Sequence, residues 1–437
     1  MTNHELLELL HCEVVPAIGC TEPIAVALCV ARAKEKLGAE PEKIKVLLSK
    51  NVYKNALAVG IPNTGMTGLP IAIALGATVG RSEYMLEVLR DATPEAVAYA
   101  KEYMQRVPAD IQINYEAPSI LYIHAEVSCG DKTAQATIQD GHTRFVGEAV
   151  KDGEAVKGGE AVKTGEAVKD GEAVKDDEEL TLRRVYDFAK EVDVEDVAFL
   201  LEGAEMNKQA AETSFANEYG HKLGRLLHSN TLKQTPQLQQ LFGDTIFTKI
   251  VSYTCGACDA RMSGAMVPVM SNSGSGNQGI SCSVPVYLYA MENNCSRELT
   301  LRALALSNLT VIYIKQSLGR LSALCGCVVA ATGSAAGITL LMGGNYEEIT
   351  YAIKNMIANI SGMICDGAKP GCALKVTSGV STAIFSAYLA MQHSYADSTE
   401  GIVEDDIDRT IRNLTRIGHD GMQVTDDLIL DIMTHKG

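Results

Sequence analysis

The order of apolar and polar residues changes character twice along the chain. Residues 4–38 carry apolar side chains at helical spacing, with a break at Pro16 and with Gly38 as the expected C-terminal stop. Residues 43–146 instead contain short runs in which apolar and polar side chains alternate, which is typical of half-buried strands. After residue 177 the helical period returns and continues almost to the end of the chain.

This order predicts an α+β fold. A mainly α-helical domain is expected from residues 1–40 together with 178–437, interrupted by a smaller inserted α+β domain at 41–146. Within the insert, the Gly-Asp pair at 130–131 and the Gly-His pair at 141–142 have the sequence of hairpin turns. Both ends of the chain are then expected to lie on the helical domain.

Between the two predicted domains lies a short tandem repeat. Residues 147–176 read GEAVKD, GEAVKG, GEAVKT, GEAVKD and GEAVKD. A six-residue period occurs in β-helices, but such a coil uses about three units per turn, and this repeat is too short to bury a core. We therefore expect residues 147–177 to form an exposed hairpin or linker that takes no part in the chemistry.

Composition and charge limit which partners and which cellular compartment are expected. The net charge of -16 disfavours nucleic acid and anionic membrane surfaces as partners. Twelve cysteines are dispersed through the chain, which opens with an acidic amphipathic helix rather than a secretory leader. These features favour a reducing cytoplasm. The absence of Trp and the abundance of Gly, Ala, Ser and Met predict a core of closely approaching helices.

One uncharged run raises a membrane alternative. The run between Arg320 and Glu347 is long enough to span a bilayer. Glycines recur throughout it, and no basic loop flanks it. A buried helix-turn-helix in the core of a soluble protein is therefore favoured over a transmembrane segment.

Three cysteines lie in nearly uncharged, glycine-rich sequence: Cys327, Cys365 and Cys372. Three thiolates can hold a metal or an iron-sulfur cluster and leave one coordination position open, as a Lewis-acid catalyst requires. Free cysteine is also among the most buried residue types and often behaves as a small apolar side chain. Spacing alone favours this second interpretation.

A fourth cysteine, Cys20, directly precedes a predicted helix. Thr21 is a candidate N-cap and Pro23 falls in the first turn. A thiol at a helix N-terminus has its thiolate form favoured by the helix dipole. A buried small residue fits the local sequence equally well.

Two neutral loops and one arginine are candidates for binding a small carboxylate. The loop at 53–70 and the loop at 271–286 both offer backbone amides and small polar side chains. Arg261 lies in a neutral segment and is suited to a carboxylate, although a structural pair with Asp259 is the favoured alternative. Turn chemistry also explains most of the loop residues. The candidate substrate-binding residues are Asn63, Thr64, Arg261, Ser273, Ser275 and Asn277.

Other motifs carry less information. Cys255 and Cys258 form a single CxxC in a helical stretch, with neither the second pair of a zinc ribbon nor the βαβ context of a thioredoxin-like site, so we interpret them as packing residues. The loop at 271–286 lacks the GK[ST] of a P-loop, which favours a small anion over a nucleotide. No GxSxG or HExxH motif supports a hydrolase.

Seven segments form an ordered set. They are IGCTEPIAVAL, YKNALAVGIPNTGMTGLPIAIALG, GHT at 141–143, DARMSG, SGSGNQGIS, GCVVAATGSAAG and MICDGAKPGCALKV. In this order they resemble the L-cysteine desulfidase family, which is related to the alpha-subunit domain of iron-sulfur L-serine dehydratases. The resemblance covers essentially the whole chain apart from the repeat at 147–176.

The resemblance implies a β-eliminating lyase that is independent of pyridoxal phosphate and converts L-cysteine to pyruvate, ammonia and hydrogen sulfide. It implies a 4Fe-4S cluster with one iron open to substrate, held by Cys327, Cys365 and Cys372, and it implies Cys20 as the catalytic base. The related dehydratases place a C-terminal cysteine tail near the cluster. This chain ends in DIMTHKG, so whether Cys20 takes that place at rest is left open.

Three alternatives remain at this point. The same mechanism acting on L-serine would make the protein an L-serine dehydratase, because the leaving group that the pocket prefers is not visible in the sequence. A non-catalytic zinc or redox protein and a helical binding protein with buried thiols belong to other classes. The expected partner is a small amino acid, and the oligomeric state is left open with a homodimer as the candidate.

Overall fold

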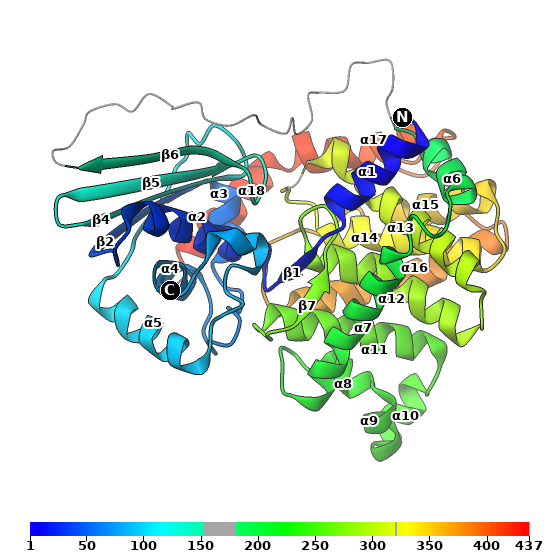
Figure 1. Cartoon of the computed structure of the whole chain (residues 1–437). Helices are drawn as coiled ribbons and strands as arrows, with labels where there is room; N and C mark the ends of the chain where they lie inside the picture. The colour runs from blue at the N-terminus through cyan, green and yellow to red at the C-terminus, as the bar shows by residue number, and fades with distance from the viewer. Residues whose placement is uncertain (153–179, 320, 437) are drawn as a thin grey trace.

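A mixed β-sheet with its own helices stands beside a larger body of helices (Figure 1). The structure is a computed structural model, and it describes residues 1–152, 180–319 and 321–436. It is 60% helical, which confirms the expected α+β class with helix predominant.

The sheet has five strands in the order β3-β2-β4-β5-β6. β2 pairs with β3 in parallel, and the remaining neighbours are antiparallel. The two predicted hairpin turns are confirmed, because they join β4 to β5 and β5 to β6. The strands are β2 (Lys43–Leu48), β3 (Asp110–Ile113), β4 (Tyr122–Cys129), β5 (Lys132–Gln139) and β6 (Phe145–Asp152).

The first unit of the tandem repeat belongs to this sheet. Residues 147–152 lie in β6 and pair with β5, so this part of the predicted linker is a strand. The other units of the repeat lie outside the described residues.

Alternation along the strands buries one face of the sheet. Ile123, Ala125 and Val127 of β4 are fully buried, while the residues between them are only partly so. Helix α2 packs on β4 and β5, α4 packs on α2, and α5 packs on α4. The helices of this unit are α2 (Thr21–Leu37), α3 (Lys50–Ala56), α4 (Leu69–Thr78), the 3-10 helix η1 (Ser82–Glu87) and α5 (Pro94–Arg106).

The packing of α2 differs from the predicted domain division, which placed residues 1–40 with the helical domain. Helix α1 does join the helical core through Leu6 and Leu10. Residues of α2 from Ile24 to Leu37 instead belong to the core of the sheet unit. Helical periodicity identifies α2 as a helix, but its apolar face does not reveal which of two cores will cover it. The change of core thus falls near residue 20 rather than residue 40.

The helical body is larger and includes a two-stranded sheet of β1 (Pro16–Ile18) and β7 (Pro268–Met270). Its other elements are α1 (Asn3–Glu13), α6 (Leu182–Glu191), α7 (Phe199–Ala216), α8 (Leu223–Leu227), α9 (Ser229–Gln234), α10 (Pro236–Phe242), α11 (Ile246–Met262), α12 (Gly276–Glu292), α13 (Arg297–Leu318), α14 (Gly326–Leu341), α15 (Tyr346–Ile360), α16 (Cys372–Met391), α17 (Ile407–Arg416), the π-helix η2 (Ile417–Gly421) and α18 (Gln423–Thr434).

Helix α14 lies at the centre of this body. It packs against α12, α13, α15 and α16, which explains why its sequence is apolar on every side. A Cβ at Gly333 would stand 2.5 Å from the carbonyl oxygen of Ser307, so glycine allows α13 and α14 to approach closely. The uncharged run after Arg320 therefore contains a buried core helix, as predicted.

Helix α16 is the one helix within the described ranges that is long and apolar enough to cross a membrane by length and composition. It packs against α11, α14 and α15 on one side. Core helices of soluble proteins pass the same test of length and composition.

The C-terminal helix leaves the helical body. Helix α18 packs against α3 of the sheet unit (Figure 1). There the side chain of Lys54, which is 2% exposed, forms an ion pair with Asp426, and Asn51 donates a hydrogen bond to the same carboxylate. Helix α18 also contacts η2, so the C-terminal helix bridges the two units, whereas both chain ends were expected on the helical domain.

A cysteine-lined candidate active site

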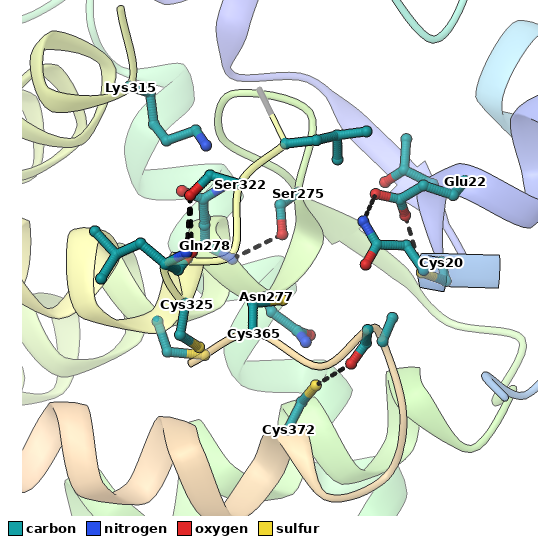
Figure 2. A pocket seen from close by; sticks show the side chains of 18 of the residues that line it. Cys20, Glu22, Ser275, Asn277, Gln278, Lys315, Ser322, Cys325, Cys365 and Cys372 are labelled. Carbon is teal, nitrogen blue, oxygen red and sulfur yellow. Dashed lines mark hydrogen bonds between the residues drawn. The ribbon is translucent and has the colours of Figure 1, made fainter. Parts of the chain in front are cut away.

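A cavity of about 100 Å³ opens where the two units meet. Its lining comes from α2 and α3 of the sheet unit and from α11, α12, α13, α14 and α16 of the helical body, together with the loops before α14 and α16. Figure 2 shows Cys20 and Glu22 at one side of this cavity, apart from Cys325, Cys365 and Cys372.

Four helices begin at the cavity. Cys20 is the N-cap of α2, Ser275 that of α12 and Cys325 that of α14, while Cys372 is the first residue of α16. Helix N-termini carry unpaired N–H groups and the positive end of the helix dipole. The cavity is thus suited to thiolates and to a small carboxylate.

Five cysteines line the cavity: Cys20, Cys325, Cys327, Cys365 and Cys372. Backbone pairing brings the loops of two of them together. The N–H of Cys325 donates to Met363 O at 2.9 Å, and the N–H of Cys365 donates to Ala323 O at 2.7 Å. The structure therefore places Cys327, Cys365 and Cys372 around one cavity, and it adds Cys325 to them.

The protonation of these thiols depends on burial and on the thiols themselves. Burial raises the pKa of Cys365, and it raises that of Cys372 to about 11. The pKa of Cys325 is lowered to about 7 because its sulfur accepts a hydrogen bond from the Cys327 thiol. That bond is the first cause that raises the pKa of Cys327 well above its ordinary value. Binding of a metal group here would release protons.

The donor set at the cavity consists of cysteine thiols, which are the usual ligands of iron-sulfur clusters. In residues 1–152, 180–319 and 321–436, no three His, Cys, Asp or Glu side chains converge closely enough to hold one metal ion. In a cubane cluster each thiolate binds a different iron, so its ligands need not converge on one point. The cations Lys54 and Lys375 lie near Cys365 and favour its thiolate.

Cys20 lies at the start of α2 as predicted, but its electrostatics differ from the expectation. Its thiol is buried and donates to Glu22 Oε2 at 3.3 Å. Burial, followed by the charge of Glu22, raises its pKa well above the ordinary value, and Arg261 opposes this shift. The helix dipole is therefore outweighed, and Cys20 is a neutral thiol in this structure.

Glu22 is held from the sheet unit. Asn55 Nδ2 donates to Glu22 Oε1 at 3.2 Å, and His142 Nε2 lies 4.0 Å from the same oxygen. Asn55 comes from α3 and His142 from the turn between β5 and β6. The N-terminal turn of α2 thus presents a carboxylate that two separate segments of the sheet unit approach.

Arg261, at the end of α11, brings a buried cation to the cavity. Its Nη1 donates to Asn277 Oδ1 at 3.0 Å and its Nη2 to Thr21 Oγ1 at 3.5 Å. Its Nε is buried without a hydrogen-bond partner among the described residues. A Cβ at Gly276 would stand 2.3 Å from that Nε, so glycine at 276 makes room for the guanidinium.

Asp259 does not form the structural pair with Arg261 that the sequence favoured. Its Oδ1 accepts the backbone N–H of His221 at 3.1 Å, and its Oδ2 accepts that of Gly224 at 3.5 Å. Arg261 is thus directed toward neutral side chains and the cavity.

The loop before α12 contributes part of the predicted set. Ser275 caps the helix by accepting the N–H of Gln278 at 3.4 Å, and Ser275, Asn277 and Gln278 line the cavity (Figure 2). Gln278 Oε1 is buried and has no partner among the described residues. These groups offer neutral donors and acceptors beside the guanidinium of Arg261.

Three predicted substrate-binding residues lie outside the cavity. Thr64 Oγ1 donates to Ile61 O at 2.8 Å, and Asn63 donates to Ala92 O at 3.3 Å. Ser273 Oγ donates to Asn272 Oδ1 at 2.8 Å. Asn63 and Ser273 have positive φ. Their polar groups hold turns together, which is the turn chemistry that sequence could not separate from ligand binding.

The structure also brings in residues that sequence reasoning missed: Glu22, Asn55, Gln278, Lys315 and Cys325. Two of them had a visible signal. Lys315 is a buried cation near the end of a long apolar helix, and Cys325 stands two residues before Cys327 in CGC. Cys255 and Cys258, by contrast, are buried within α11 and do not line the cavity, in keeping with a packing role.

Comparison with known proteins gives one family and several full-length relatives. The family described as serine dehydratase alpha chain matches residues 83–431. A UPF0597 protein of Bacteroides fragilis is 56% identical over 433 residues, covering 99% of this chain and 98% of that protein. A UPF0597 protein of Oleidesulfovibrio alaskensis is 45% identical over 435 residues, covering 98% of this chain and 97% of that protein. The family match includes the cysteines of α14 and α16, whereas Cys20 and Glu22 precede it.

Proposed function

Since the chain belongs to the serine dehydratase alpha chain family, a family of lyase-type enzymes, we propose that it is an iron-sulfur-dependent β-eliminating lyase. Its proposed substrate is L-cysteine, which would yield pyruvate, ammonia and hydrogen sulfide. The observation that carries this proposal is the meeting of five cysteines and the buried Arg261 around one cavity.

The proposed cofactor is a 4Fe-4S cluster, which the family generally uses. Cys327, Cys365 and Cys372 would hold it. When bound, a cluster with one iron free of protein ligands supplies a Lewis acid for the leaving group and the carboxylate. Cys325 is an alternative to Cys327 as the first ligand. Its sulfur lies close enough to Cys365 and Cys372 that a charge on it raises the pKa of both thiols.

The substrate carboxylate would bind Arg261 and the N-terminus of α12. A guanidinium forms two parallel hydrogen bonds with a carboxylate, and the free N–H groups of the helix add to them. Asn277 orients Arg261 from the same helix turn. This arrangement fixes the position of Cα relative to Cys20.

Cys20 would accept the α-proton. A thiolate in a buried position is a stronger base than one in water, because burial raises its proton affinity. Proton transfer by a positioned group contributes about 10²- to 10⁴-fold to a rate.

L-serine is the second candidate substrate, because the name of the matching family favours it. Both substrates share the carboxylate, the ammonium group and the α-proton, so Arg261 and Cys20 would act identically on them. They differ only in the thiol or hydroxyl that leaves.

The test is an anaerobic preparation assayed with both amino acids. We expect a brown protein with iron and acid-labile sulfide that releases pyruvate from L-cysteine together with sulfide, at a higher kcat/KM than from L-serine. Preference for L-serine would replace the substrate and keep the mechanism. A colourless protein with stoichiometric zinc and no turnover of either amino acid would overturn the proposal.

A further inference from the structure

Glu22 is the nearest ionisable partner of the Cys20 thiol, and the proposed reaction as described so far gives it no role. The S–H of Cys20 donates to Glu22 Oε2 at 3.3 Å, and Glu22 also lines the cavity. We propose that Glu22 is the proton acceptor of Cys20, and that Asn55 and His142 are positioning residues that hold its carboxylate. This inference rests on the proposed lyase function.

The chemistry requires such a group. Cys20 is buried and neutral, so it cannot take the α-proton until its own proton has a destination. A free thiolate in this position would be costly because burial penalises charge. Coupling the two proton transfers avoids a free thiolate, since one proton reaches the sulfur as the other leaves it.

The proton balance closes over one turnover. The α-proton moves to the Cys20 sulfur while the thiol proton moves to Glu22, and the electron pair of the C–H bond expels hydrogensulfide. Glu22 then gives its proton to the hydrogensulfide, which leaves as hydrogen sulfide. Cys20 is again a neutral thiol and Glu22 again a carboxylate, so the elimination itself needs no further reactant, and hydrolysis of the aminoacrylate to pyruvate and ammonia then consumes one water.

The side chain of Glu22 is largely buried and is held in position by its neighbours, unlike that of a surface residue. Its side chain is 12% exposed, whereas that of His142 is 5% exposed. Asn55 and His142 both approach Oε1, while the Cys20 thiol approaches Oε2. One carboxylate oxygen is thus occupied by the support, and the other faces the thiol.

An alternative role for Glu22 is binding of the substrate ammonium group. That role would appear chiefly in KM, because it acts in the ground state as much as in the transition state. A proton acceptor for Cys20 acts in kcat. The two roles therefore separate in steady-state kinetics.

The test compares Glu22→Gln with wild type and with Glu148→Gln. Glu148 lies on β6 outside the cavity and pairs with Lys36 at 2.7 Å, so it gives the same change of charge on the same unit. We expect Glu22→Gln to retain its iron, to keep KM within about twofold and to lose about 10²- to 10⁴-fold in kcat. Glu148→Gln should behave as wild type, and Glu22→Asp should recover part of the loss.

A second measurement does not depend on turnover. The charge of Glu22 raises the pKa of Cys20, so Glu22→Gln should speed alkylation of Cys20 by iodoacetamide at a fixed alkaline pH, as followed by peptide mass spectrometry. Faster alkylation together with slower turnover would show that Cys20 is intact, reachable and more readily ionised in the variant, so that the slower turnover follows from the missing carboxylate and not from a disturbed thiol.

Several outcomes would overturn the inference: wild-type kcat in Glu22→Gln, a loss confined to KM, or an unchanged alkylation rate of Cys20.

Should Glu22→Gln fail to fold, Asn55→Ala provides the test. We expect this variant to lose about tenfold in kcat and to keep its iron content. Full kcat in Asn55→Ala would also overturn the inference. Failure of the lyase proposal itself is distinguishable, since wild type would then be inactive.

Discussion

At the scale of single residues, cysteines of one chain take different roles because their surroundings differ. Cys325 accepts a hydrogen bond from a neighbouring thiol, and its pKa falls to about 7. Cys20 faces a carboxylate and is neutral. Cys258 is buried beside the cavity without lining it. The first suits a ligand, the second a proton carrier and the third a packing residue.

Alanine substitutions should separate these roles. Cys327→Ala, Cys365→Ala and Cys372→Ala are each expected to remove the cluster and its visible absorbance, because each would supply a ligand. Cys20→Ser is the matched control, expected to keep most of the iron and to lose turnover by at least about 10²-fold. Iron content and absorbance of anaerobic preparations measure both.

Cys325→Ala tests whether Cys325 or Cys327 is the first cluster ligand. If it keeps the cluster while Cys327→Ala loses it, the ligand assignment stands. The reverse result would move the first ligand from Cys327 to Cys325. Full iron content in Cys365→Ala or Cys372→Ala would contradict the assignment at that position.

Part of this site could be predicted from sequence, because some of its residue types are unusual in the segments where they occur. Cysteines and an arginine in nearly uncharged, glycine-rich segments stand out, and the structure gathers Cys20, Arg261 and Cys372 around one cavity. Glu22 and Asn55 did not stand out. Their contact joins residues of different helices, and only the packing of α2 against α3 brings them together.

At the scale of elements, helix N-termini build the site. Helices α2, α12, α14 and α16 all begin at the cavity, so backbone N–H groups and dipoles face it from several directions. Periodicity predicted α2, α14 and most of α16, but it predicted α12 only from Pro285 onward, whereas the helix begins at Gly276. Their convergence could not be predicted, because α2 joins the sheet core and the other three join the helical core.

Helix α18 provides a test of how the two units are held together. Breaking a buried ion pair by removing one partner costs about 3–5 kcal/mol, because the remaining charge is left uncompensated. We expect Asp426→Asn to destabilise the protein by this amount in urea unfolding, since Lys54 is 2% exposed. Replacing both residues together by Met and Leu should cost less than Asp426→Asn alone.

A control lies on the same two helices. Lys50 pairs with Asp427, and these side chains are 36% and 58% exposed. Exposed pairs contribute less than about 1 kcal/mol, so Lys50→Met should have little effect. Equal losses from the buried and the exposed pair would contradict this description of the α3 and α18 contact.

At the scale of the whole molecule, the site depends on both units. The sheet unit supplies Glu22, Asn55 and His142, while the helical body supplies the four proposed or competing cluster cysteines and Arg261. Neither unit alone holds the acid-base pair and the metal ligands. The elimination is thus assigned to the interface of the two units, and relatives similar over the full length carry both.

The proposed cluster has one iron open to substrate, and Mössbauer spectroscopy of anaerobically prepared protein can detect that iron directly. On addition of L-cysteine to a Cys20→Ser variant that binds without turnover, we predict that the signal of one iron changes and that the others stay as they were. Four irons that are all unaffected by saturating substrate, or protein without iron, would contradict the account.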